Sequence, residues 1–272
     1  MIIDTHTHVY PEKIARAVEE AALQGVAEET KLYGSITING LLSSMEHNGV
    51  DISAIFCLAE KASQVRAAND FVIQSADQKR LFGLGTMLPD FENYEAEINR
   101  LRSNGIKGIK WSSLFQAFEL DDERMFPLYE ALGDDMVAYF HMGRGPGKKH
   151  AVHANSTPDR LARVIETFPK MKVVAAHFGG LFMLEEAREQ LIGKDIYLDI
   201  VWSPSISELE PNLVADIIRE HGTDKILFGT DYPFCDVKAE IEAVSRLPLR
   251  PEDKERIFWE NAKELFGLET AR

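Results

Sequence analysis

The sequence has few of the features that mark secreted or membrane-spanning proteins. Its two cysteines, Cys57 and Cys235, cannot build a disulfide framework, and we expect both to be reduced thiols. No apolar run reaches the ~18 residues that a membrane span requires. The N-terminus has neither the basic region nor the small-residue cleavage site of a signal peptide. We therefore expect a cytoplasmic protein with no membrane partner.

Positive charge is also scarce. The 30 lysines and arginines are outnumbered by 44 aspartates and glutamates, which leaves a formal net charge of −14. Because nucleic acids are bound mainly by neutralising their phosphates, this balance argues against a nucleic-acid partner. A hydrophobic content of 45% and a charged content of 27% are instead typical of a globular protein. We expect a small-molecule substrate, and the sequence leaves homo-oligomerisation open.

What the sequence does contain is an alternation of short apolar runs with helix-patterned stretches. The apolar runs have the character of buried strands and begin near Ile2, Ile52, Leu81, Ile106, Met136, Lys172, Ile196 and Lys225. Strands that alternate with helices predict βαβ units and a parallel sheet. Their number and the chain length match a single (β/α)8 TIM barrel, with residues 1–272 forming one domain. A doubly wound open sheet is the alternative.

Two connections are longer than a minimal barrel needs. The segment after the first strand contains two helical patterns, Pro11–Gln24 and Thr37–Asn48, so we expect an extra helix there. The last strand is followed by a second helical pattern, Pro251–Phe266, which is placed to close the barrel. The sequence shows no internal repeat, low-complexity segment or linker.

Histidines gather where the predicted strands end. The run Asp4-Thr5-His6-Thr7-His8 directly follows a short apolar segment. Because side chains alternate along a strand, His6 and His8 point the same way. The fifth and sixth predicted strands end on His141 and His177. Active sites of TIM barrels are built at the C-terminal ends of the strands, so these four residues are expected to converge.

Two charged residues occupy equivalent positions on other strands. Lys110 ends the fourth predicted strand, and Asp231 ends the eighth. Taken alone, each histidine can be an ordinary half-buried residue, and Asp231 can cap the following helix. A lysine directly after a buried strand must find solvent, a partner or a lowered pKa. The convergence of all six residues favours a functional site.

These residues lie in motifs that resemble the amidohydrolase superfamily, and most closely its amidohydrolase-related (amidohydrolase 2) branch of metal-dependent TIM-barrel hydrolases and decarboxylases. The resemblance covers nearly the whole chain and is carried by Ile3-Asp4-Thr5-His6-Thr7-His8, Gly105-Ile106-Lys107-Gly108-Ile109-Lys110, Ala176-His177-Phe178-Gly179-Gly180, Leu227-Phe228-Gly229-Thr230-Asp231-Tyr232-Pro233 and Asn261-Ala262-Lys263-Glu264-Leu265-Phe266-Gly267-Leu268. It implies that four residues bind a metal ion, namely His6, His8, His141 and Asp231. It places His177 beside the metal, in contact with substrate or water.

The chemistry of these side chains agrees with that implication. Imidazole and carboxylate groups suit zinc, and a catalytic site keeps one position open for water or substrate. We expect one Zn²⁺, with Mn²⁺ or a second ion left open. Asp231 and His177 are the candidate catalytic residues: Asp231 as a proton carrier and His177 as a hydrogen-bond partner of the substrate oxygen. By the resemblance, Lys110 is either a carboxylated, metal-bridging lysine or an unmodified one that faces the substrate.

Substrate contacts are sought in the loops after the strands. Residues 142–150 carry a positive cluster with Arg144, Lys148, Lys149 and His150, with His153 just beyond, in a strongly acidic chain. Arg144 can bind a carboxylate through two of its guanidinium N–H groups, although a solvated loop is an equal alternative. Lys110, Trp111 and Trp202 are further candidates for substrate binding. Asp199, near the end of the seventh strand, can orient a ligand histidine or make a structural hydrogen bond.

The leading functional hypothesis is a metal-dependent hydrolase that directs water at a small, anionic ester, lactone or amide. The first alternative is a metal-dependent lyase, a decarboxylase or hydratase of an unsaturated or aromatic acid, because the same ligand set serves both reactions. A metal-dependent phosphodiesterase is disfavoured, since such relatives carry a glutamate where Lys110 stands. A non-catalytic metal-binding protein is the remaining alternative. Substrate identity depends on loop chemistry, which the fold alone does not specify.

Overall fold

The computed structural model describes residues 1–24, 31–144 and 155–269. Within these ranges, eight short strands occur at the predicted positions: β1 (Ile3–Asp4), β2 (Ile52–Ile55), β3 (Leu81–Gly83), β4 (Gly108–Trp111), β5 (Val137–Phe140), β6 (Lys172–Ala175), β7 (Tyr197–Asp199) and β8 (Ile226–Leu227). All neighbouring pairs run parallel, with β1 to β3 in one sheet and β4 to β8 in another. The alternating apolar pattern therefore predicted the strands correctly.

The two sheets join at both edges and close into a barrel. On one side Gly85 bridges to Ile109, and the amide of Lys110 donates to the carbonyl of Gly85 at 2.8 Å. On the other side Thr7 bridges to Tyr232, next to the ends of β1 and β8. An open doubly wound sheet would leave two unpaired edges, so the (β/α)8 TIM-barrel prediction is confirmed.

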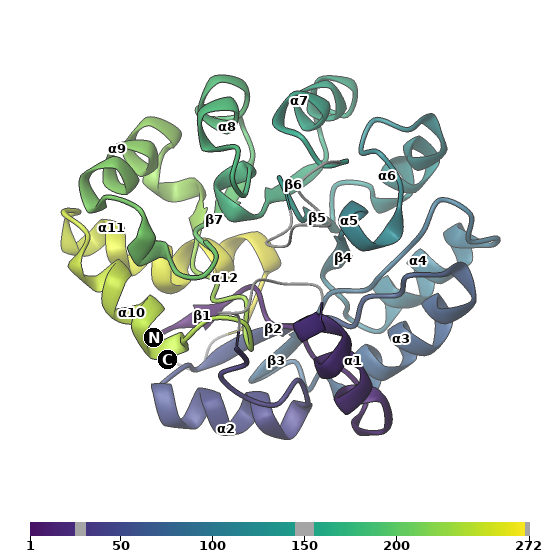
Figure 1. Ribbon diagram of the computed structural model, residues 1–272. Helices are drawn as coiled ribbons and strands as arrows, with labels where there is room; N and C mark the ends of the chain where they lie inside the picture. Colours follow the sequence, from purple (N-terminus) through teal and green to yellow (C-terminus); the bar gives the residue numbers. More distant parts are fainter. Residues whose placement is uncertain (25–30, 145–154, 270–272) are drawn as a thin grey trace.

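The helices form a ring around the strands (Figure 1). They are α1 (Glu12–Gln24), α2 (Ile38–Asn48), α3 (Ala62–Ser75), α4 (Tyr94–Ser103), α5 (Ser113–Gln116), α6 (Phe126–Leu132), α7 (Pro158–Thr167), α8 (Leu184–Gln190), α9 (Pro211–His221), α10 (Val237–Arg246), α11 (Pro251–Glu255) and α12 (Asn261–Phe266). Short 3-10 turns cover Glu123–Met125, His177–Gly179, Ile206–Glu208 and Thr223–Lys225. The two helices predicted after the first strand are α1 and α2.

The predicted closing helix is present but is not uniform. A π-helical turn, Arg256–Glu260, separates α11 from α12 within the expected span. Residues of α12 pack with the inward-facing side chains of the barrel, and the rings of Phe82 and Phe266 lie 4.8 Å apart. The barrel interior is thus filled by side chains from β1 to β8 and covered by the C-terminal helix, as in a packed core.

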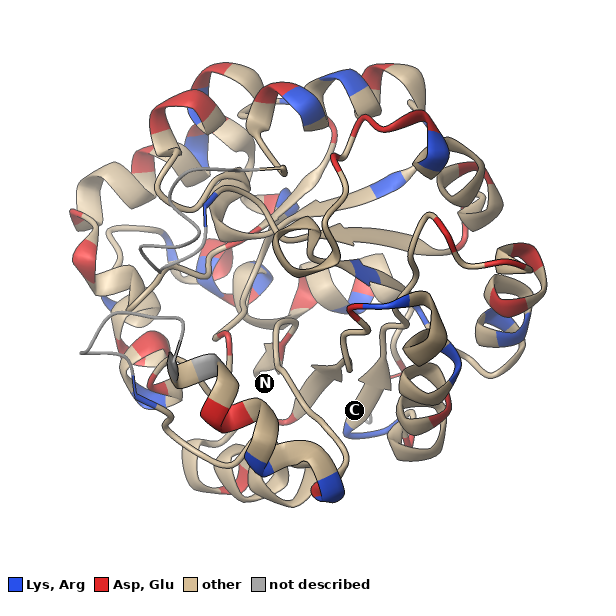
Figure 2. Ribbon diagram, turned by 45° about the vertical axis from the view of Figure 1, so that its right-hand side comes forward, with Lys and Arg blue, Asp and Glu red and all other residues tan. Residues whose placement is uncertain are grey.

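Charged residues lie mostly on the outer helices, as Figure 2 shows. The apolar layer between helices and strands is continuous and includes Ile109, Phe140 and Ile218. None of the helices in the described ranges is both long and apolar enough to cross a membrane. The structure therefore separates a charged outer surface from the polar residues buried inside the barrel.

Removing the aromatic ring that covers the barrel should destabilise the fold strongly. Phe266 is 3% exposed and packs on Phe82. Phe266→Ala leaves a cavity among buried side chains, and we expect the free energy of unfolding to fall by about 3–5 kcal/mol. Urea denaturation measures this value. Phe182→Ala is the matched control, because Phe182 is 49% exposed and its loss should cost less than ~1 kcal/mol. Equal losses would contradict the closing role of α12.

Candidate metal centre

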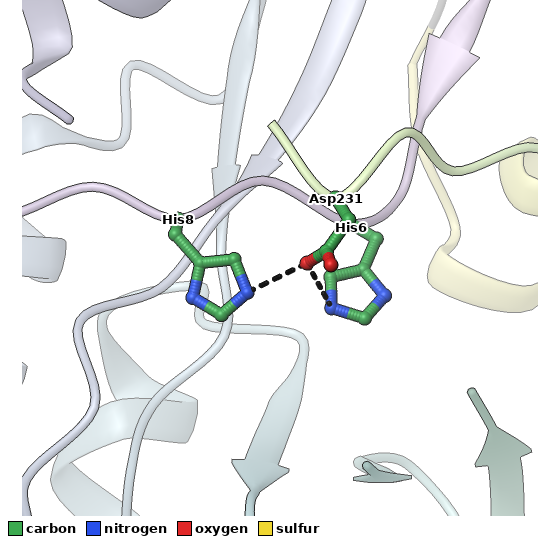
Figure 3. Close-up of side chains that lie close together, drawn as sticks. All are labelled: His6, His8 and Asp231. Carbon is green, nitrogen blue, oxygen red and sulfur yellow. Dashed lines mark hydrogen bonds and ion pairs between the residues drawn. The ribbon is translucent and has the colours of Figure 1, made fainter. Parts of the chain in front are cut away.

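Three of the four predicted metal ligands meet at the seam between β1 and β8. One ligand atom each from His6, His8 and Asp231 lies within 4.8 Å of the others. Asp231 Oδ1 is 2.9 Å from His8 Nε2 and 3.4 Å from His6 Nε2, so both rings direct the same type of nitrogen at one carboxylate oxygen (Figure 3). The strand alternation predicted this pairing of the two histidines.

The seam itself is held by a buried carboxylate that precedes the histidines. Asp4 accepts hydrogen bonds from the hydroxyl of Thr230 at 2.6 Å and from its backbone amide at 3.1 Å. It also accepts from the amide of His6 at 3.1 Å. Gly229 allows this close approach, because a Cβ atom there would lie 2.9 Å from the His6 Cβ. The residues around the ligands therefore fix the distance between the two chain segments.

Asp199 orients His6 from behind. Its Oδ2 atom accepts a hydrogen bond from His6 Nδ1 at 2.7 Å and one from the Tyr139 hydroxyl at 2.7 Å. Its Oδ1 atom accepts from the amides of His177 at 2.7 Å and Val201 at 3.1 Å. The carboxylate thereby fixes the His6 tautomer and leaves Nε2 free to act as a ligand, an arrangement typical of metal-binding histidines. Of the two roles considered for Asp199, orientation of a histidine agrees with this geometry.

His141 and His177 form a second pair next to the first. His177 Nε2 lies 2.9 Å from His141 Nδ1, and the His6 and His177 rings are 5.3 Å apart. His141, expected as the fourth ligand, thus contacts His177 and is not part of the three-residue group in the described chain. The buried Nε2 of His141 and Nδ1 of His177 have no hydrogen-bond partner among the described residues. Both rings keep one nitrogen available for a ligand.

Burial determines the protonation of these rings. Desolvation lowers the pKa of His8, and it lowers the pKa of His141 well below its ordinary value. It also lowers the pKa of His177 to about 4. Burial alone would raise the pKa of Asp231, but the nearby His6 and His8 hold it well below its ordinary range. At neutral pH His8, His141 and His177 are therefore neutral and Asp231 is ionised, the forms that bind metal ions.

Lys110 enters the same interior from β4. It pairs in register with Tyr139 on β5, and its Nζ atom lies 4.3 Å from the centre of the Tyr139 ring. Burial lowers the pKa of Lys110 to about 8, against the opposing attraction of Asp199 and Asp231. Its amine has no hydrogen-bond partner among the described residues. The sequence indicated an unusual lysine at this position, and the structure agrees.

The other predicted substrate contacts are placed differently. Trp111 stacks on Phe140 and meets Tyr129 edge to face, in the layer between strands and helices. Its expected place in the substrate site does not fit this packing, because the inward turn of Lys110 sends the next side chain outward. Trp202 is buried in the loop after β7, with its ring 5.9 Å from that of Phe182.

Arg144 is exposed in the loop after β5, and its amide donates to the carbonyl of Leu181. The remainder of the positive cluster, with Lys148, Lys149, His150 and His153, lies outside the described residues. The alternative role of Asp231 as a helix cap is not observed, because Asp236 caps α10 through the amides of Lys238 and Ala239.

The backbone is strained at two of the site residues. Asp231 has a φ of 58° and His177 a φ of 59°, and Phe178 follows at 51°. Side chains with a Cβ rarely adopt this left-handed region, which costs of the order of 1–3 kcal/mol for each residue. Strain of this kind persists where the surrounding structure holds a side chain in place. Here the left-handed backbone of Asp231 directs its carboxylate toward His6 and His8.

Sequence reasoning did not identify two supporting residues, Asp4 and Tyr139. Burial raises the pKa of Asp4 to about 7 despite its hydrogen bonds to Thr230 and His6. Strand alternation places Tyr139 on the same inward face as Val137 and His141. A residue with a polar hydroxyl on that face of an apolar strand could have indicated a role in the site. The partners of both residues are far away in the sequence and become visible only in the fold.

The donor set fits a divalent transition-metal ion. Two imidazole nitrogens and a carboxylate oxygen converge, and one histidine is oriented by a second carboxylate. Three protein ligands with an additional nearby histidine are common for catalytic rather than structural sites. The residues therefore fit the metal that the resemblance implies.

Asp199→Asn tests the orienting role of this carboxylate. The asparagine side chain can donate as well as accept, so it no longer fixes the tautomer of His6. We therefore expect the affinity for Zn²⁺ or Mn²⁺ to fall by about 10–100-fold. Competition with a chelator measures the dissociation constant. Asp195→Asn is the control, because Asp195 is exposed and pairs with Lys225. Unchanged metal affinity in Asp199→Asn would reject the role.

Lys110→Met should stabilise the metal-free protein. The folded protein disfavours the charged lysine, since its pKa is about 8 compared with an ordinary value of 10.5. At pH 7 the variant should gain of the order of 3 kcal/mol in free energy of unfolding. The gain should shrink as the pH rises from about 8 toward 10.5, because above that pH the lysine amine is neutral in both the folded and the unfolded wild-type protein. Denaturation at several pH values measures it, with Lys107→Met as control. A loss of stability at pH 7 would contradict the unpaired state of Lys110.

Comparison with known proteins places this site in a wider context. Over 273 aligned residues the chain is 23% identical to gamma-resorcylate decarboxylase from Polaromonas sp. (strain JS666 / ATCC BAA-500), and the alignment covers 81% of each chain. A solved structure of 5-carboxyvanillate decarboxylase from Novosphingobium aromaticivorans, complexed with manganese and 4-hydroxy-3-methoxy-5-nitrobenzoic acid, has a TM-score of 0.74 at 19% identity and covers 98% of this chain and 96% of that one.

A further solved structure, 2,6-dihydroxybenzoate decarboxylase from Rhizobium, has a TM-score of 0.70 at 15% identity and covers 98% of both chains. At these identities the two solved structures establish a shared fold. The family model described as amidohydrolase matches residues 3–268, nearly the whole chain. The motifs, the barrel and this match agree, and the protein belongs to the amidohydrolase family.

Proposed function

We propose that this protein is a metal-dependent decarboxylase of a small aromatic or unsaturated carboxylic acid. The observation that carries the proposal is the group formed by His6, His8 and Asp231 at the C-terminal end of the barrel. The relatives named above support a lyase, because each is described as a decarboxylase. The expected hydrolase uses the same ligand set, but its leading position in the sequence-based hypothesis is not supported by these relatives.

His6, His8 and Asp231 would hold the ion, with His141 as the proposed fourth ligand through its unpartnered Nε2. The manganese in the 5-carboxyvanillate decarboxylase structure supports a divalent ion, and both Zn²⁺ and Mn²⁺ suit nitrogen and carboxylate ligands. A bound ion supplies Lewis acidity that polarises a substrate oxygen.

In the proposed reaction the bond between the carboxylate carbon and the substrate carbon breaks. Carbon dioxide leaves, the electron pair stays on the substrate carbon, and that carbon takes up one proton. Asp231 is ionised and lies between the two histidines, so it can accept a proton from the substrate and return it to that carbon. The neutral His177 can hydrogen-bond the substrate oxygen on which charge develops.

Arg144 and Trp202 are the proposed outer contacts of the substrate. Arg144 is exposed on the loop after β5, where a guanidinium can meet an incoming anion. Trp202 is largely buried on the loop after β7 and can present part of its ring as an apolar wall. The net charge of −14 supports a small acid over a nucleic acid as the partner.

Release of carbon dioxide from a panel of acids tests this function. The panel contains dihydroxybenzoates, carboxyvanillates and unsaturated diacids, assayed with Zn²⁺- and Mn²⁺-loaded protein. Asp231→Asn should lower turnover by at least ~100-fold, because it removes the proton carrier. Asp236→Asn is the control, since asparagine also caps a helix and α10 should remain intact.

A second panel of esters, lactones and amides separates the lyase from the hydrolase. Turnover of these compounds without carbon dioxide release from any acid would overturn the proposed lyase and restore the hydrolase hypothesis. Turnover that persists in Asp231→Asn would reject the site itself, whichever reaction is observed.

A further inference from the structure

Lys110 carries a buried amine for which the described residues provide no hydrogen-bond acceptor. The residue is 1% exposed, and its Nζ atom lies 4.3 Å from the centre of the Tyr139 ring and 5.3 Å from that of the Phe56 ring. Ring faces attract a cation, but more weakly than a carboxylate does. A buried ammonium group without an acceptor is costly, so this arrangement requires a partner.

The carboxylates in the same interior are already engaged by other donors. Both oxygens of Asp199 accept two hydrogen bonds each, from His6, Tyr139 and two backbone amides. Asp4 is occupied by Thr230 and the amide of His6. Asp231 faces His6 and His8. None of the three forms an ion pair with Lys110 in the described chain, although Asp199 and Asp231 attract it at longer range.

Lys110 nevertheless belongs to the same surface as the metal ligands. Its register partner Tyr139 donates to Asp199, which in turn holds His6. The two rings next to the Lys110 amine also contact the ligand histidines: the centre of the Phe56 ring lies 4.6 Å from that of His8, and the centre of the Tyr139 ring lies 5.7 Å from that of His6. A molecule bound at the candidate metal centre is therefore within the electrostatic range of this amine.

We propose that Lys110 binds a carboxylate of the substrate that is retained in the product, so that the preferred substrate is a dicarboxylic acid. This inference rests on the proposed decarboxylation and deepens it. A substrate carboxylate would accept a hydrogen bond from the Lys110 amine, which has no acceptor among the described residues. In a buried site of low polarity, such a charge-assisted pair is stronger than one made by an exposed cation such as Arg144.

The chemistry of the reaction decides which carboxylate Lys110 binds. If the ammonium group paired with the carboxylate that leaves as carbon dioxide, the pair would be strongest before the reaction and would weaken as the negative charge moved to carbon. An interaction stronger in the ground state than in the transition state slows the reaction. A second carboxylate keeps its charge throughout, so binding it orients the substrate without raising the barrier.

Ligand binding without turnover tests the inference. Isothermal titration of the Mn²⁺-loaded protein compares two matched pairs of probes, isophthalate with benzoate and cis,cis-muconate with sorbate. In the wild type we expect at least one diacid to bind about 10-fold more tightly than its monoacid. Lys110→Met should abolish that preference, with Lys110→Gln as a second variant. Lys107→Met, which removes the lysine that directly precedes β4, should preserve the preference.

Two results would overturn the inference. In the first, neither diacid binds the wild type more tightly than its monoacid. In the second, the preference survives in both Lys110 variants while their thermal unfolding shows intact folds. The proposed function fails independently, through the absence of carbon dioxide release. A Lys110-dependent diacid preference without carbon dioxide release would retain the subsite and reject the reaction.

Discussion

The carboxylate of Asp4 accepts hydrogen bonds from the hydroxyl and amide of Thr230, which lies 226 residues away in the chain. This contact joins the ends of β1 and β8 and brings Asp231 to the two histidines that follow Asp4. Its geometry depends on Gly229, where a side chain would collide with His6. Without this seam the chain would still contain every candidate ligand, but the ligands would lie on two separate sheet edges. The closed barrel is therefore the condition for the site.

The interior at this end of the barrel contains both neutral and charged polar side chains. The rings of His8, His141 and His177 are neutral, and the carboxylates of Asp199 and Asp231 are ionised and accept hydrogen bonds or form ion pairs. The amine of Lys110 has no acceptor among the described residues. Burying polar groups in this state opposes folding, and so does the left-handed backbone of Asp231 and His177. The large apolar layers around the barrel offset these costs. The apolar layers thus stabilise the fold, and the preorganised site at one end of the barrel destabilises it.

The same arrangement accounts for the difficulty of separating a hydrolase from a lyase. The candidate metal ligands follow β1 and β8, and Asp199 orients one of them. This arrangement forms a metal site with an ionised carboxylate, but it does not specify which bond of the substrate breaks. That choice depends on how the substrate is held, for which we propose Lys110 and Arg144 as contacts. The shared fold therefore limits the possible reactions without specifying one, and in our proposal the buried amine of Lys110 narrows the substrate class.

The sequence by itself determined the strand positions, the pairing of His6 with His8 and the closing helix, because strand alternation and apolar periodicity are local properties of neighbouring residues. The same local rule should have excluded Trp111, whose outward direction follows from the inward direction of Lys110. Only the tertiary structure decided that Asp199 holds His6, that His141 contacts His177 and that the amine of Lys110 lacks a partner. These contacts join residues from different strands, and their distances depend on barrel closure and side-chain packing, which no local pattern encodes.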